Sequence, residues 1–305
     1  MRSFLRHITE MSMPVVLLLL VCSLVMWTVD YIRMPEQWIQ LLATQTLVLV
    51  CAVMLCAVLY RAKATARFTL LPAVLYVSAM AVLPLLRIHW QPQLVVAVLL
   101  FFLYATRDMS DTHEPNGLVF FVTILLCLTA LLMPDALWCV PMIWIVVLLQ
   151  GAFTFRTIMA SLLAIALICI YYVLAMYIGQ AEMWDYSVLI DRHWFAQHLP
   201  VCLTTSIGIM LLAFLLITGC AFRRSSYDLV STRMLLYHIV LWGLLSAPLI
   251  VFSVAEPYNW VMLPFTLSAV TGIYLLQRQS ESRGVTFLLY LTGVVTLYLW
   301  NILAL

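Results

Sequence analysis

Long apolar runs constrain the fold of this chain more than any other feature. Runs of about 17–23 residues, nearly free of charged side chains, recur along all 305 residues. Only 9% of the residues are charged, whereas an ordinary soluble domain has about 25%. A water-soluble fold could not cover this much apolar surface with polar groups, so the surrounding solvent must be lipid.

In lipid, every backbone N–H and C=O group needs a partner within the protein, which leaves helices or a closed barrel as spanning structures. The runs are too long and too continuously apolar for barrel strands, which alternate over about 10 residues. The sequence therefore predicts an all-α, polytopic transmembrane helical bundle that forms a single domain over 1–305. We place its eleven spans at 13–29, 38–60, 68–86, 92–106, 117–133, 136–155, 157–179, 199–221, 234–255, 258–276 and 285–304.

The distribution of Lys and Arg predicts how these spans are oriented. With the N-terminus in the cytoplasm, twelve of the 15 basic residues fall on the inner side, and the outer exceptions are Arg33, Arg87 and Arg192. Cytoplasmic loops carry such an excess of positive charge. We therefore expect a multi-pass protein of the bacterial inner membrane with its C-terminus outside. The first run lacks a small-x-small cleavage site, so we expect it to be retained.

Two segments outside the spans have distinct patterns. Within residues 1–12, Phe4, Leu5 and Ile8 share one helical face near two arginines, which fits an interfacial amphipathic helix or a frayed end equally well. Residues 180–198 form the longest outer loop.

Several function classes are disfavoured. The net charge of +2 gives no basic surface for nucleic acid. No nucleotide-binding motif occurs, the eight cysteines contain no CxxC pair, and no HxH or HExxH is present, so we expect no cofactor and no metal. Mid-span polar residues are mild, such as Thr44, Gln45 and Gln150, which disfavours an ion-coupled transporter.

Three predicted outer hairpins each carry a tryptophan between two prolines. The tryptophans are Trp90, Trp138 and Trp260. Proline ends or kinks a helix, and tryptophan prefers the headgroup level of a membrane. The hairpins are therefore either anchored tight turns or the tips of helical hairpins that converge on a shallow cavity.

Polar side chains gather in the outer turns above nearly charge-free helices. Carboxylates and imidazoles suit proton transfer, and arginine suits phosphate recognition. The candidate catalytic residues are Asp30, Glu36, Asp135, Asp191 and His193. The candidate substrate-binding residues are Arg33, Arg87, Trp90, Trp138, Arg192 and Trp260. The alternative is that these residues belong to solvated loops.

Two resemblances bear on function. Residues 71–76, 91–94 and 134–156 resemble an uncharacterised polytopic membrane family of Bacteroidota in helix spacing and proline placement, and this implies no activity. Residues 132–137 and 258–264 resemble hairpins of polyprenyl-phosphate-dependent glycosyltransferases of the C-type fold. That resemblance implies work at the outer face with a catalytic acid in the first outer loop. Only Asp30 or Glu36 matches that position, and the loop here is shorter than in those enzymes.

These observations favour a protein that binds or processes a lipid-linked substrate of the polyprenyl-phosphate type at the outer leaflet. In its catalytic form, glycosyl transfer, one acid would act as general base while an arginine holds the carrier phosphate. The alternatives are a non-catalytic membrane subunit or scaffold of an envelope complex, and a lipid or solute transporter. The expected partners are accordingly membrane lipids, a lipid-linked glycan carrier or an envelope-complex protein.

Overall fold

A computed structural model describes most of the chain, and all of its regular elements are helices. It describes residues 13–64, 69–106, 116–179, 201–225, 230–252, 261–276 and 283–304, and no strand occurs among them. The all-α prediction is confirmed for this part of the chain. Several predictions fall outside the described residues: the interfacial helix at 1–12, the loop 180–198, and the candidates Asp191, Arg192, His193 and Trp260.

Each of the eleven predicted ranges corresponds to one of the longer helices. The helices are α2 (Met13–Arg33), α3 (Trp38–Arg61), α4 (Leu71–Val82), α6 (Gln91–Ala105), α7 (Asn116–Ala130), α8 (Val140–Leu149), α9 (Phe155–Gly179), α11 (Val201–Ser225), α12 (Val230–Phe252), α13 (Met262–Leu276) and α14 (Arg283–Ala304). Three short elements accompany them, namely η1 (Pro35–Gln37), α5 (Pro84–Ile88) and η3 (Pro134–Cys139).

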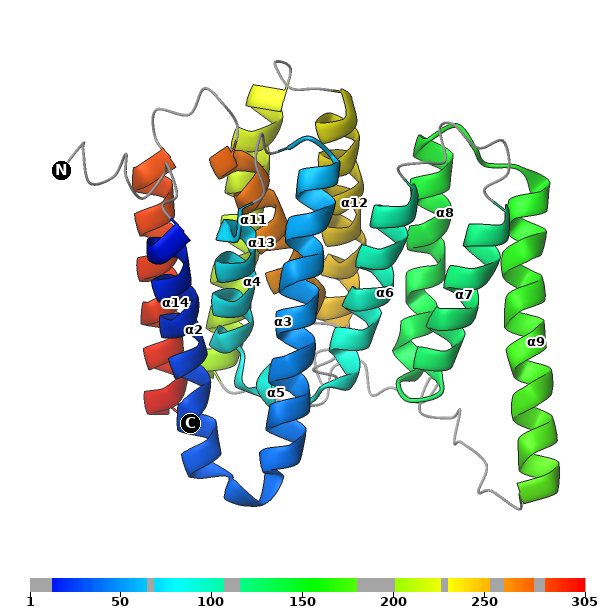
Figure 1. The fold of residues 1–305 in the computed structure, drawn as a ribbon, viewed down its shortest axis with the longest axis horizontal. Coiled ribbons are helices and arrows are strands. Elements are labelled where there is room, and N and C mark those ends of the chain that lie inside the picture. Colours follow the sequence, from blue (N-terminus) through cyan, green and yellow to red (C-terminus); the bar gives the residue numbers. More distant parts are fainter. Residues whose placement is uncertain are drawn as a thin grey trace.

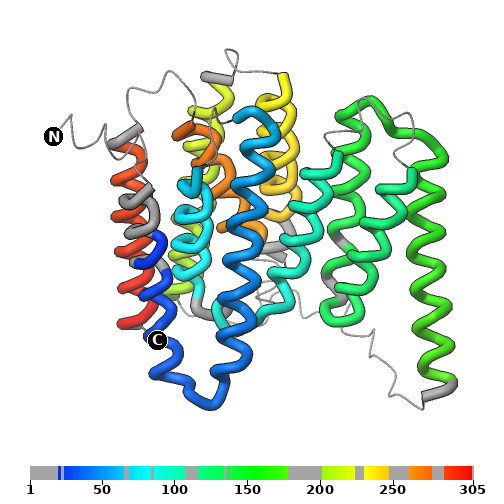
Figure 2. Tube along the Cα trace, viewed as in Figure 1, coloured from blue at the N-terminus to red at the C-terminus, as the bar shows by residue number. Residues whose placement is uncertain are grey.

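The helices run side by side as one bundle, with turns at two opposite ends (Figure 1). One end, which we call the Asp30 end, carries η1, α5 and the C-terminal end of α9. The other, which we call the Arg61 end, carries the ends of α3, α6 and α8. Figure 2 follows the same path and places the N-terminal and C-terminal helices α2 and α14 together at one edge.

Within the described ranges, four helical segments are long and apolar enough to cross a membrane. They are Pro35–Arg61, Phe155–Tyr177, Val201–Arg223 and Val285–Leu303. A helix of 15 residues, such as α6, is only about 22 Å long, whereas the hydrocarbon core of a bilayer is about 30 Å thick. The composition and these four segments indicate a membrane protein, while the count of eleven spans and the orientation remain predictions.

The centre of the bundle is filled by α4 and α13. Every residue of α4 and all of α13 up to Leu275 are buried, as expected for helices that are apolar on all sides. The two helices approach closely at Gly272 of α13. A Cβ atom added there would already lie in van der Waals contact with Pro72 of α4, at 3.5 Å. Tyr76 and Phe265 meet edge to face with their ring centroids 6.3 Å apart. The longer outer helices present apolar side chains outward, where lipid would cover them.

Two predicted spans are shorter in the structure, for local backbone reasons. The range 68–86 is interrupted at Leu83, which is extended (φ −98°, ψ 104°) because the following Pro84 disfavours the helical conformation. The chain then restarts as α5. The range 136–155 is taken up by η3 and α8, which ends before Gly151 in a left-handed turn with φ 70°.

Candidate functional site

The charged residues of the Asp30 end form a buried ion pair. Asp30 lies in the last turn of α2, and Arg87 lies in α5, beyond the break at Leu83. Arg87 Nη1 is 2.6 Å from Asp30 Oδ2, and the two side chains are 2% and 6% exposed. The interruption of α4 therefore has a consequence for the site, since it places Arg87 on a separate short helix that meets α2.

This ion pair leaves polar atoms unsatisfied. Although Nη1 and Oδ2 are close, neither they nor Arg87 Nε make a hydrogen bond of acceptable geometry with any described residue. Buried polar groups in proteins are nearly always hydrogen-bonded, and a guanidinium has five N–H donors to satisfy. Arg87 thus keeps donor capacity inside a closed, largely apolar environment.

Burial and mutual attraction act in opposite directions on the pair. Both residues lie beyond the predicted spans 13–29 and 68–86. Burial raises the pKa of Asp30, while the positive charges of Arg87 and Arg33 lower it. Burial likewise lowers the pKa of Arg87, and the Asp30 carboxylate opposes this shift. Burial is the larger effect for both groups, so the pKa of Asp30 is raised and the pKa of Arg87 is lowered despite their mutual attraction.

Helix α14 closes this site from the side. The Arg87 guanidinium carbon lies 5.4 Å from the centroid of the Tyr298 ring, within the range of a cation–π contact. The Tyr298 hydroxyl donates to the Met26 carbonyl of α2. Arg33, which is exposed, donates from Nη2 to the Ile302 carbonyl at 3.2 Å.

A buried asparagine of α14 joins the broken end of α4 to α11. Asn301 Nδ2 donates to the Val82 carbonyl at 2.9 Å, and Asn301 Oδ1 accepts from the Ser206 hydroxyl at 3.2 Å. The Val82 carbonyl belongs to the last turn of α4, where carbonyls lack helical partners. Sequence reasoning missed Asn301 and Tyr298. The sequence feature that could have indicated Asn301 is a single amide side chain near the end of an otherwise apolar helix.

The other candidates whose side chains are described, Glu36 and Trp90, do not join this cluster. Glu36 lies in η1 with an exposed side chain, and Trp90, just after α5, is half-buried. Asp135 and Trp138 lie in η3, which follows α7. Among the described candidates, the structure therefore brings together Asp30, Arg33 and Arg87.

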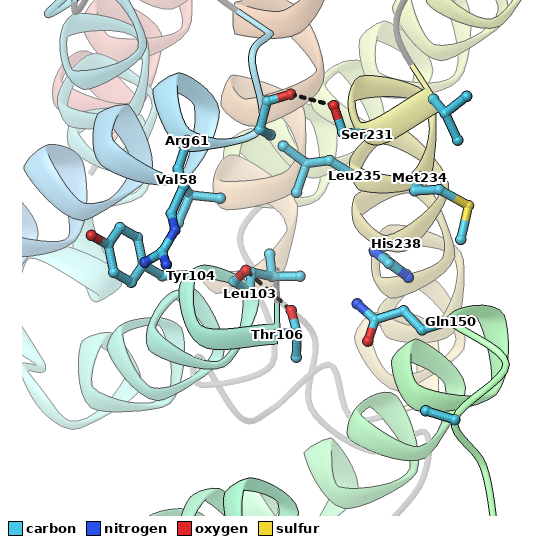
Figure 3. A pocket seen from close by; sticks show the side chains of 13 residues that line it. Val58, Arg61, Leu103, Tyr104, Thr106, Gln150, Ser231, Met234, Leu235 and His238 are labelled. Carbon is cyan, nitrogen blue, oxygen red and sulfur yellow. Dashed lines mark hydrogen bonds between the residues drawn. The ribbon is translucent and has the colours of Figure 1, made fainter. Parts of the chain in front are cut away.

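A second polar region at the Arg61 end was not predicted. A cavity of about 340 Å³ opens there between α3, α6, α12 and the residues that follow α8 (Figure 3). Its walls include Arg61, Tyr104, Gln150 and His238. These residues come from four distant parts of the sequence, so no local motif could have indicated the cavity.

The chain matches no family model, no curated protein and no solved structure. Among the described residues, no group of three or more His, Cys, Asp or Glu side chains is arranged to hold a metal ion. Any functional conclusion therefore depends on the geometry of the two polar regions.

Proposed function

We propose that this chain is a multi-pass protein of the bacterial inner membrane that binds the phosphate of a lipid-linked, polyprenyl-phosphate-type substrate at the outer leaflet. The Asp30 end is its binding region. The observation that carries the proposal is Arg87, whose Nη1 is engaged by Asp30 but whose buried Nε has no hydrogen-bond partner among the described residues.

The charges of the cluster support an anionic ligand. Two arginines, Arg33 and Arg87, lie near one carboxylate, Asp30, so this three-residue cluster carries one net positive charge. A guanidinium presents paired N–H donors that match two phosphate oxygens, and such charge-assisted bonds are strong. Exposed Arg33 would meet the phosphate first, and buried Arg87 would complete its coordination.

The same geometry favours binding over catalysis by Asp30. Its carboxylate is held in an ion pair with Arg87, whereas a general base must lie within hydrogen-bond reach of the proton that it abstracts. Exposed Glu36 is the described carboxylate that could serve a glycosyl-transfer reaction at this end. The centre of the bundle, where a solute path would run, is filled by α4 and α13, which supports binding at one end over transport.

Native mass spectrometry of the gently extracted protein tests this proposal. We expect a polyprenyl-phosphate adduct on the native chain and at least about tenfold less of it on Arg87→Lys and Arg33→Gln, because each change removes a paired donor. Arg156→Gln, which removes an exposed cation at the Arg61 end, is the matched control. Equal adduct on all four proteins, or bulk phospholipid alone on the native chain, would contradict the proposal.

A second candidate function is a non-catalytic subunit of an envelope complex. Small residues let membrane helices approach closely. A Cβ added to Gly208 of α11 or Gly293 of α14 would have nothing within 4 Å, so neither glycine serves a close contact with another described residue. A stoichiometric second protein in the same spectra, lost on Gly208→Leu, would favour this function.

A further inference from the structure

The cavity at the Arg61 end contains buried polar atoms that nothing described in this chain satisfies. His238 of α12 is 3% exposed and makes a hydrogen bond with the Val146 backbone, while its Nε2 atom has no partner. Gln150 Oε1, in the turn after α8, also lacks a partner. A buried polar atom without a hydrogen bond is costly, which indicates that a ligand or water completes this wall.

The opposite wall is positively charged. The Arg61 guanidinium carbon lies 4.1 Å from the centroid of the Tyr104 ring, so the stacked ring holds this cation beside the cavity. Figure 3 shows Arg61 and Tyr104 on one side, and His238 with Gln150 on the other. Ser231 donates to the Ala62 carbonyl at 2.9 Å, which fixes the rim between α12 and the end of α3.

The chemistry of these walls selects a ligand class. The Nε2 atom of a neutral imidazole whose other nitrogen donates to a carbonyl is an acceptor, and Gln150 Oε1 is an acceptor as well. A matching ligand must therefore present hydrogen-bond donors. Ammonium groups would be repelled by Arg61, whereas hydroxyl groups would not, and Arg61 favours a nearby anion.

We infer that this cavity binds a phosphate ester with neighbouring hydroxyl groups, with its phosphate at Arg61 and its hydroxyls at Gln150 and His238. The glycerol- or sugar-phosphate head of a lipid has this chemistry. A cavity of about 340 Å³ is at the lower end of the usual ligand-site range and suits such a head. This cavity lies at the end of the bundle opposite the proposed substrate site. The inference does not depend on the function proposed for that site.

Headgroup selectivity of the purified full chain tests the inference. In detergent micelles, native mass spectrometry would compare phosphatidylglycerol with phosphatidic acid, which lacks the head hydroxyls, and with phosphatidylethanolamine, which carries an ammonium. We expect at least about tenfold tighter binding of phosphatidylglycerol than of either other lipid. Equal affinity for the three lipids would overturn the inference, and this comparison needs no variant.

Matched variants locate the binding to this cavity. Gln150→Leu keeps a side chain of similar size without the acceptor, and His238→Leu removes the imidazole. We expect either change to reduce phosphatidylglycerol binding to the level of phosphatidic acid. Thr292→Val, at an exposed position of α14 outside both polar regions, should leave it unchanged. Phosphatidylglycerol selectivity that survives in both cavity variants would contradict the assignment.

The bound phosphate ester could be a soluble molecule or the headgroup of a lipid. Competition by free glycerol 3-phosphate distinguishes these two ligands. Displacement of bound phosphatidylglycerol would support a soluble phosphate ester as the occupant. Retention of the lipid at saturating glycerol 3-phosphate would support a lipid headgroup, whose acyl chains add apolar contacts. If neither compound bound the native chain, the inference would be wrong.

Discussion

The two ends of the bundle use the same pair of residue types for different purposes. At the Asp30 end, Arg87 lies 5.4 Å from the ring of Tyr298, and at the Arg61 end, Arg61 lies 4.1 Å from the ring of Tyr104. The difference is the carboxylate of Asp30, which neutralises Arg87 and is buried with it. Arg61 instead borders a cavity.

The two ends also differ in which helices their polar contacts connect. The Asp30 end joins α2, α4, α5, α11 and α14 through the ion pair, Tyr298 and Asn301. The Arg61 end joins α3 to α12 through Ser231 and Thr232, which both donate to the Ala62 carbonyl. We infer that polar groups at the first end mainly hold helices together, whereas polar groups in the cavity mainly serve a ligand. Stability measurements can separate these roles.

The largest effect is expected from breaking the ion pair. Arg87→Met should lower the free energy of unfolding by about 3–5 kcal/mol, because it leaves the Asp30 carboxylate buried without its counter-charge. The measurement is the thermal unfolding midpoint of the purified protein in detergent. The double variant Asp30→Asn/Arg87→Met should recover much of this loss, since no isolated charge remains.

Glu36→Gln provides the control for that prediction. Glu36 lies at the same end but is exposed. The unfolding free energy of the Glu36→Gln protein should therefore stay within about 0.5 kcal/mol of the native value. If Arg87→Met unfolded at the native midpoint, the ion pair would not hold this end together.

The second effect concerns the packing between the two ends. A Cβ added to Gly243 of α12 would lie 2.4 Å from Cζ of Phe214, a fully buried ring of α11. Gly243→Ala should therefore destabilise the protein by about 1–3 kcal/mol through overpacking. Gly208→Ala on α11 meets nothing within 4 Å and should be neutral or slightly stabilising. Equal midpoints for the two variants would refute this contact.

A smaller loss is expected from Asn301, which lies beside the ion pair. Asn301→Leu removes the donor to the Val82 carbonyl and leaves that buried carbonyl without its partner, at a cost of about 1–2 kcal/mol. Thr292→Val on the same helix is the control, because Thr292 is exposed and bonds only to its own helix. Asn301 would have no role in capping α4 if the two variants unfolded alike.

The sequence was sufficient to predict the helices because hydropathy is a local property. Each predicted range corresponds to one of the longer helices, and the charge-free runs alone required a helical bundle. Helix ends were predicted less well. Pro84 was visible in the sequence, but its effect on the range 68–86 depends on whether a helix bends or stops at proline, and here it stops at Val82.

The site was predicted only in part, since its contacts depend on tertiary packing. Asp30 and Arg87 were both candidates from the sequence, and the structure places them in one ion pair, but the sequence did not indicate that they would meet. Tyr298 and Asn301 contact residues more than 200 positions earlier in the chain, and no spacing rule connects such distant positions. His238 belongs to no local motif, and its place at the cavity depends on the packing of α12 against the chain after α8.

The smallest stability effect is expected at the cavity, and it is the most informative one for the comparison of the two ends. Gln150 Oε1 has no hydrogen-bond partner among the described residues, so Gln150→Leu removes an unsatisfied acceptor rather than an interaction. The unfolding free energy of the lipid-free protein should stay within about 0.5 kcal/mol of the native value. Added phosphatidylglycerol should raise the unfolding midpoint of the native chain but not that of the variant, because only a ligand that binds the folded state stabilises it. A large loss of stability in the lipid-free variant would show that Gln150 holds helices together, as the residues of the Asp30 end do.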